Sequence, residues 1–223
     1  MINRELYMEQ ITPFIDKPFV KVITGIRRCG KSVVLRLIRE ELLRRGVSED
    51  HIIYMNFESF EWMDVKEAKA LYTYIREVTK VSGKYYILLD EIQEVTDWEK
   101  AVNAFLVDLD ADIYVTGFPI RLLSSEFSTY LAGRYVAFHI MTLSFREYLL
   151  FHNVPLAISA SDRKAEFLKY LRMGGFPAIH TANYDYNAIY KIVYDIYSSV
   201  ILRDTVQRHG IRNVEMLERI VKF

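Results

Sequence analysis

Short apolar runs alternate along the first part of the chain with longer segments whose apolar residues recur every three or four positions. The runs, closed by glycine, polar or acidic residues, predict β-strands, and the periodic segments predict helices. The predicted strands are Phe19–Thr24, His51–Phe57, Tyr85–Leu89, Asp112–Thr116 and Tyr135–Met141. The predicted helices between them are Ser32–Arg45, Val65–Val78, Trp98–Leu109 and Arg121–Leu131. Because the two kinds of element alternate, the pattern indicates a doubly wound α/β sheet, with parallel strands buried on both faces.

The pattern changes after Ser144, where the predicted strands stop. From there the apolar spacing predicts helices alone, interrupted around Gly174, Gly175 and Pro177. These helices are Phe145–His152, Arg163–Met173, Tyr186–Arg208 and Val214–Phe223. We therefore expect an α/β domain at residues 1–143 and a smaller helical region at residues 144–223. The last helix carries no stop signal, so we expect the chain to be a piece of something longer.

Composition and charge add a few limits to this picture. Of the 223 residues, 51% are hydrophobic, which is enough for a substantial core, and 29 basic residues balance 29 acidic ones. Net charge therefore gives no indication of a nucleic-acid partner. The single cysteine, Cys29, excludes an internal disulfide and fits a reducing compartment. With no signal peptide and no apolar run long enough to span a bilayer, we expect a soluble cytoplasmic protein.

The loop after the first predicted strand carries the strongest chemical signal. Its sequence, GIRRCGKS, matches the phosphate-binding pattern G-x-x-x-x-G-K-[ST] at every fixed position, between a strand and a helix as that pattern requires. The glycines let backbone N–H groups approach phosphates, Lys31 would reach the β- and γ-phosphates, and Ser32 would ligate magnesium. Arg27 and Arg28 either add positive charge there or are solvated. The predicted nucleotide-binding residues are Gly25, Ile26, Arg27, Arg28, Cys29, Gly30, Lys31, Ser32 and Val33.

Two acids follow the third predicted strand directly. Tyr85–Leu89 is apolar throughout and ends in Asp90 and Glu91, which is the shape of a Walker B motif. Ligands in open α/β sheets bind beyond the carboxyl ends of the strands, where both acids are expected to lie. Asp90 would hold the magnesium shell, and Glu91 would polarise the attacking water as general base. Without the phosphate-binding loop, the same acids would be interpreted as a solvated strand end.

The chain as a whole resembles the AAA+-like ATPases of bacteria and archaea that carry a further C-terminal domain of unknown function. The combination of LAGRY with LSFREYL is specific to this group rather than to P-loop proteins in general. The matching stretches, in chain order, are VITGIRRCGKSVVL, IIYMNFES, YYILLDEIQEVTDWEKAV, LLSSEFSTYLAGRYV, TLSFREYL, GGFP and ILRDTVQRHGIRN.

This resemblance implies ATP as the nucleotide and a P-loop NTPase three-layer sandwich, with a five-stranded sheet of order 5-1-4-3-2. It implies that Asn56 restrains Glu91, although a strand-end cap is an equal interpretation. It also implies that Arg134 acts on the γ-phosphate, in cis or from a neighbouring subunit of a homo-oligomer. A structural salt bridge is the alternative for Arg134.

The chain departs from the group in two places. A polar sensor segment usually follows the fourth strand, but here the residues are Thr116, Gly117, Phe118 and Pro119. Neither Phe118 nor Pro119 offers a side-chain hydrogen bond, so Thr116 would have to substitute, or hydrolysis would be slow. The family also continues into a winged-helix-like segment, of which Val214–Phe223 would be the beginning.

These observations leave three functions open. The chain is expected to be an Mg²⁺-dependent ATPase that couples hydrolysis to a conformational change. The alternative is a nucleotide-binding switch with little turnover. Association with nucleic acid is a third possibility, suggested by the basic and aromatic segment Tyr184–Arg212, but packing of a helical surface is the favoured interpretation of that segment.

Overall fold

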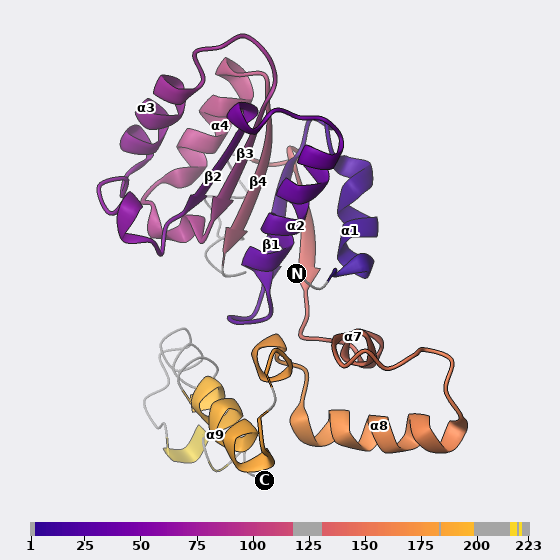
Figure 1. Ribbon diagram of the computed structural model, residues 1–223. Helices are drawn as coiled ribbons and strands as arrows, with labels where there is room; N and C mark the ends of the chain where they lie inside the picture. The colour runs from indigo at the N-terminus through magenta and orange to yellow at the C-terminus, as the bar shows by residue number, and fades with distance from the viewer. Residues whose placement is uncertain (1–2, 118–130, 183, 199–214, 218, 220–223) are drawn as a thin grey trace. The chain divides into compact units, whose positions relative to one another are not determined.

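The computed structural model describes residues 3–117, 131–182, 184–198, 215–217 and 219. The chain divides into two compact units, Met1–Met141 and Thr142–Phe223 (Figure 1). Three parts of the predictions lie outside the described residues: most of the predicted helix Arg121–Leu131, Phe118 and Pro119 after the fourth strand, and most of the predicted helix Val214–Phe223.

The first unit is built on a five-stranded parallel sheet. Its strands are β1 Val20–Gly25, β2 Ile52–Asn56, β3 Tyr85–Asp90, β4 Ala111–Gly117 and β5 Tyr135–Ile140. Their order, β2-β3-β4-β1-β5, is the predicted order counted from the opposite edge, and this prediction is confirmed. Because every strand runs in the same direction, all five carboxyl ends lie along one edge of the sheet.

Helices cover both faces of this sheet (Figure 1). The helices of one face are α1 Glu5–Ile11 and α2 Lys31–Arg44, and those of the other are α3 Ala68–Val78 and α4 Trp98–Asp108. Side chains of each strand alternate between the two faces: Ile87 and Leu89 of β3 pack with the α3–α4 side, and Leu88 packs with the α1–α2 side. The result is the predicted three-layer α/β fold.

Two local features of this unit differ from the sequence prediction. Helix α1 is not predicted at all. Helix α3 begins at Ala68 rather than Val65, because the residues before it are extended alongside Thr96. Thr96 N donates to Lys66 O at 2.8 Å, and Ala68 N donates to Thr96 O at 2.9 Å. These backbone hydrogen bonds replace the first helical turn.

The second unit is helical in its described part. Its helices are α7 Phe145–Phe151, α8 Ala160–Met173 and α9 Tyr186–Ile196. Side chains cap each N-terminus: Ser144 forms a capping box with Glu147, and Ser159 and Asp185 accept from the backbone of α8 and α9. The cap at Ser159 explains why α8 begins three residues before the predicted Arg163. Short 3₁₀ helices in the two units are η1 Thr12–Phe14, η2 Glu49–His51, η3 Phe60–Trp62, η4 Ile92–Glu94 and η5 Pro177–His180.

Candidate functional site

The glycine-rich loop joins the end of β1 to the start of α2. A Cβ atom on Gly25 would lie 2.3 Å from Ile140 O, so only glycine fits there. Arg28 and Gly30 both adopt positive φ, of 66° and 105°, and Gly30 is the N-cap of α2. Such a turn directs backbone N–H groups inward, and the positive end of a 14-residue helix faces the same space. The loop therefore has the backbone features expected of a phosphate-binding turn.

The side chains inside the loop differ in their surroundings. Arg27 and Arg28 are exposed, and Arg27 pairs with Glu58 at 3.0 Å. Ile26 is exposed as well, whereas Cys29 is fully buried. Burial raises the pKa of the Cys29 thiol, although the charge of Lys31 opposes this shift. Cys29 therefore behaves as a small packing residue.

Lys31 lies at the centre of the candidate site and is 4% exposed. Its Nζ atom is 3.4 Å from Gly25 O and 3.3 Å from Glu91 Oε1. Both distances exceed the 2.7–2.9 Å typical of charge-assisted hydrogen bonds. The ammonium group is thus held beside the loop, but weakly enough to be redirected to a stronger anionic partner.

Asp90, the last residue of β3, is fully buried. Its two carboxylate oxygens accept from Thr116 Oγ1 at 2.5 Å and from the Tyr54 hydroxyl at 2.9 Å. Burial, and then the charge of Asp90, raise the pKa of Tyr54, so the phenol stays protonated and keeps donating. Two neighbouring strands thereby fix the orientation of this carboxylate.

Glu91 follows Asp90 in the left-handed conformation, with φ of 56°. Its backbone N donates to Thr116 Oγ1 at 2.9 Å, so one hydroxyl bridges both acids. Gln93 Nε2 donates to Glu91 Oε2 at 2.6 Å, while Lys31 lies beside Oε1. The Glu91 carboxylate is therefore held toward the glycine-rich loop. The Thr116 hydroxyl thus contacts both acids, and its role as a sensor stays a prediction.

Asn56 ends β2 beside Asp90, as the resemblance implies, whereas Arg134 lies away from the loop. Asn56 Oδ1 accepts from Glu58 N at 2.9 Å, as in a strand-end cap. Arg134 O accepts from Val20 N, which places Arg134 at the amino ends of the strands. β1 has six residues, so the two edges of the sheet are roughly 20 Å apart. An action of Arg134 on the nucleotide of its own chain does not fit this distance. Arg134 Nη1 donates to Asn103 Oδ1 at 3.0 Å, which fits a structural role, and an action on a neighbouring subunit stays a prediction.

Two further residues of the site were missed from the sequence. Tyr54 and Gln93 contact Asp90 and Glu91. Gln93 lies two positions after Glu91 in the matching stretch LLDEIQ, and this was the available signal for it. Tyr54 had no comparable signal, since its contact depends on the pairing of β2 with β3.

The donors fit magnesium rather than a softer metal. Ser32, in the first turn of α2, and Asp90 supply hydroxyl and carboxylate oxygens, which this ion prefers. Within the described ranges, no cluster of three or more His, Cys, Asp or Glu side chains could hold a metal by itself. Phosphate oxygens and water would have to complete the shell. In the same ranges, no helix is long and apolar enough to cross a membrane.

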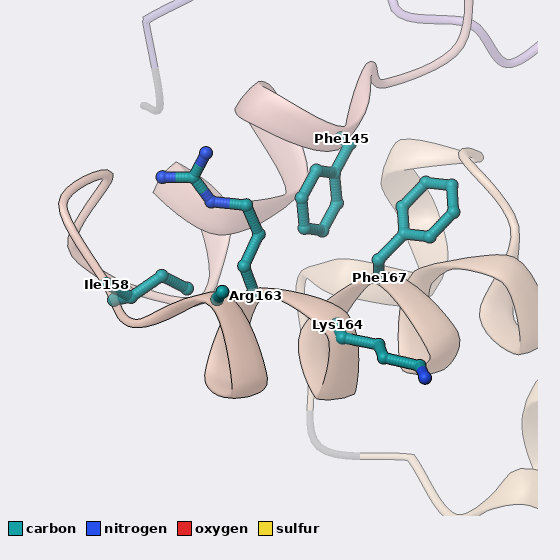
Figure 2. Close-up of a pocket in the computed structure, with 6 residues that line it drawn as sticks. Phe145, Ile158, Arg163, Lys164 and Phe167 are labelled. Atoms are coloured by element: carbon teal, nitrogen blue, oxygen red, sulfur yellow. The ribbon is translucent and has the colours of Figure 1, made fainter.

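A separate hollow lies in the second unit (Figure 2). The rings of Phe145 and Phe167 meet edge to face, with centroids 5.1 Å apart. The lining residues are Phe145, Ile158, Ala160, Arg163, Lys164 and Phe167. None of them belongs to the predicted nucleotide site, which is built entirely from the first unit.

Comparison with known proteins gives relatives over the whole chain. The model of a family described as "AAA domain" matches residues 17–149. An uncharacterized protein of Haemophilus influenzae is 40% identical over 224 residues, covering 100% of this chain and 55% of its own length. An uncharacterized protein of Methanocaldococcus jannaschii is 34% identical over 223 residues, covering 98% and 48%. The chain thus spans about half the length of these curated relatives.

A solved structure, the Walker-type ATPase PABY2304 of Pyrococcus abyssi, has a similar fold. The TM-score is 0.58 at 13% identity, over 94% of this chain and 76% of that one. At this identity the similarity concerns the fold alone. It agrees with the P-loop NTPase architecture described above.

Proposed function

The chain belongs to the AAA domain family, and on this premise we propose that it binds ATP with Mg²⁺ and hydrolyses it, coupling hydrolysis to a conformational change. The observation that carries the proposal is the convergence at one sheet edge of the glycine-rich loop, Lys31 and the Asp90–Glu91 pair. Each of these groups has a separate task with a nucleoside triphosphate.

Binding comes from the loop and from Lys31. The inward N–H groups and the start of α2 would hold the phosphate oxygens. Lys31 would leave its long contacts with Gly25 O and Glu91 for the β- and γ-phosphates, which accept much stronger hydrogen bonds. Ser32 and Asp90 would hold Mg²⁺, which supplies charge neutralisation on the phosphates when bound.

Hydrolysis requires a base close to the γ-phosphate. When Lys31 turns to the phosphates, Glu91 Oε1 loses its cationic neighbour and can accept a proton from water. Gln93 keeps the other carboxylate oxygen in place. Arg134 of a neighbouring subunit would add positive charge at the γ-phosphate in a homo-oligomer.

A nucleotide-binding switch with little turnover is the second candidate. The Thr116 hydroxyl already contacts Asp90 and Glu91 N. This supports the switch, because Thr116 is then not available as a sensor of the γ-phosphate. Phe118 and Pro119 cannot take that role with their side chains. Both candidates bind ATP, and they differ only in rate. With either candidate we propose a cytoplasmic location, and neither candidate requires nucleic acid.

The experiment measures Mg-ATP affinity and phosphate release for the whole chain and for Lys31→Ala, Glu91→Gln and Arg134→Ala across protein concentrations. We expect Lys31→Ala to weaken binding at least about 100-fold, because the phosphates lose a buried cation. Glu91→Gln should keep binding and lose turnover. Arg134→Ala should lose the part of the turnover that rises with protein concentration.

Two exposed variants are matched controls. Lys100→Ala removes a lysine paired with Asp97 on the surface, and Glu94→Gln removes an acid three residues from Glu91. Both should behave as wild type. Wild type that fails to bind ATP contradicts the whole proposal, whereas binding without measurable phosphate release favours the switch. Equal phosphate release by wild type and Glu91→Gln would reject Glu91 as base.

A further inference from the structure

Arg4 precedes α1 and is almost completely buried, with 2% of its surface exposed. Its guanidinium group reaches two distant parts of the first unit. Nη1 donates to Cys29 O at 2.9 Å, inside the glycine-rich loop, and Nη2 donates to Met141 O at 3.0 Å, just after β5. One side chain therefore ties the loop to the neighbouring end of an edge strand.

Tyr7 supports the same arrangement from the first turn of α1. The Arg4 guanidinium lies over its ring, 4.8 Å from the centroid, and the Tyr7 hydroxyl accepts from Met141 N at 2.9 Å. Both the N–H and the C=O of Met141 are thus bound by the N-terminal segment. The guanidinium is fixed by a cation–π contact as well as by two carbonyls, so its direction is well defined.

The carbonyl of Cys29 matters because its direction sets the orientation of a peptide in the glycine-rich loop. It belongs to the peptide that joins Cys29 to Gly30, and Gly30 tolerates more than one backbone conformation. If this peptide rotated, its C=O would turn toward the phosphates and its N–H away from them. The charge-assisted hydrogen bond from Arg4 holds the C=O outward, and so keeps the N–H directed inward. Arg4 also adds a positive charge behind the loop.

We propose that Arg4 is a positioning residue for nucleotide binding, which holds the Cys29–Gly30 peptide in the orientation that a phosphate needs. The inference rests on the proposed function of the loop, but it assigns a separate role to a residue outside the loop motif. Arg4 does not touch the nucleotide itself, and it acts only through the backbone of Cys29.

The test compares Arg4→Met and Arg4→Lys with wild type in the whole chain, by equilibrium binding of Mg-ATP and by thermal unfolding. Arg4→Met should raise the Kd at least about tenfold, as expected for loss of a hydrogen bond from a charged group. Arg4→Lys keeps the charge and one donor, so its Kd should lie between the other two. Val102→Ala, which makes a cavity in the core on the α4 side, controls for lowered stability.

The Kd values of these variants for Mg-ATP decide whether Arg4 positions the loop. Graded weakening in the two Arg4 variants, with Val102→Ala binding as wild type, supports the proposal. If folded Arg4→Met binds within twofold of wild type, Arg4 is only structural and the inference fails, while the proposed function stands. If Arg4→Met does not fold, Arg4→Lys decides, and an unchanged Kd there contradicts the inference. Wild type without ATP binding would overturn both.

Discussion

Two buried lysine–carboxylate pairs lie at opposite edges of the same sheet. Lys21 and Asp112 pair near the amino ends of β1 and β4, and Lys31 and Glu91 pair at the carboxyl ends. Both lysines are at most 4% exposed. As ion pairs the two look alike, but their surroundings indicate that one is structural and the other functional.

The Lys21 pair is saturated with internal partners. Lys21 also donates to Lys17 O at 2.9 Å, and Asp112 Oδ2 accepts from Asp16 N and from the Tyr114 hydroxyl, each at 2.8 Å. Burial lowers the pKa of Lys21, while the charge of Asp112 opposes that shift. This network satisfies buried groups that would otherwise destabilise the fold. Its contacts are therefore structural.

The Lys31 pair is loosely held by comparison. Its contacts are 3.3 and 3.4 Å long, and it lies where strands of an open sheet place their ligands. Burial and an ion pair do not by themselves separate a structural lysine from a functional one. The two lysines are distinguished by the lengths of their contacts and by the edge of the sheet at which they lie. The following variants test that distinction.

The largest effect is expected for Lys21→Met. It leaves the Asp112 charge buried without its cation, so we expect the free energy of unfolding to fall by about 3–5 kcal/mol. Urea unfolding measures this loss. The folded fraction should still bind Mg-ATP with wild-type affinity, since Lys21 is at the far edge of the sheet.

Adding Asp112→Asn to Lys21→Met is the control, because it removes the orphaned charge and keeps an acceptor for Asp16 N and Tyr114. Most of the lost stability should return. If Lys21→Met lowered the free energy of unfolding by less than about 1 kcal/mol, the Lys21–Asp112 pair would not be the structural pair proposed here. A weakened ATP affinity in the folded single variant would contradict that role as well.

Thr116→Val is expected to have the next largest effect. It preserves the shape of the side chain but removes the hydroxyl that joins Asp90 to Glu91 N. Leaving a buried N–H unsatisfied should cost about 1–3 kcal/mol of stability. Because both acids lose their orientation, phosphate release should fall about tenfold, with a smaller change in ATP affinity.

Thr79→Val provides the matched control. Thr79 also donates its hydroxyl, to Ile75 O at the end of α3, but it is remote from the acid pair. It should lower stability slightly and leave phosphate release unchanged. Equal turnover by Thr116→Val and wild type would show that Thr116 does not orient the acids.

Sequence patterns predicted the strands and most helices of the sheet domain well, because the spacing of apolar residues within each element reflects which of its faces is buried. The strand order required resemblance. Helix α1 was missed because seven residues allow only one buried pair at helical spacing, Tyr7 and Ile11. The start of α3 was missed because backbone pairing with Thr96 is a long-range contact, which no local period encodes.

In the candidate site too, local motifs were predicted from the sequence and long-range contacts were not. Lys31, Asp90 and Glu91 were identified from motifs, and Thr116 was named for a different role. The other side chains that contact the acids or the loop were not identified. Arg4 and Tyr54 contact atoms 25 and 36 positions away in sequence. Arg134 is a different case: it precedes a predicted parallel strand, and this alone was enough to place it at the amino-terminal edge.

The smallest and sharpest test concerns which amide restrains Glu91. The resemblance implies Asn56, whereas Gln93 is the residue that contacts the carboxylate. Gln93 Oε1 is buried and finds no partner among the described residues, so Gln93→Ala should cost little stability. Since Glu91 loses a neutral donor, we expect kcat for phosphate release to fall by about threefold to tenfold with KM unchanged.

Asn56→Ala is the matched comparison, and its phosphate release should stay within about twofold of wild type, because only the Glu58 N contact is lost. A slower Asn56→Ala beside an unaffected Gln93→Ala would instead mean that Asn56 turns to Glu91 during turnover. In that case the Lys31–Glu91 edge would rearrange once nucleotide binds, while the saturated Lys21–Asp112 network would keep its contacts. That outcome would show that the two edges of the sheet differ in how far they rearrange, as well as in the lengths of their polar contacts.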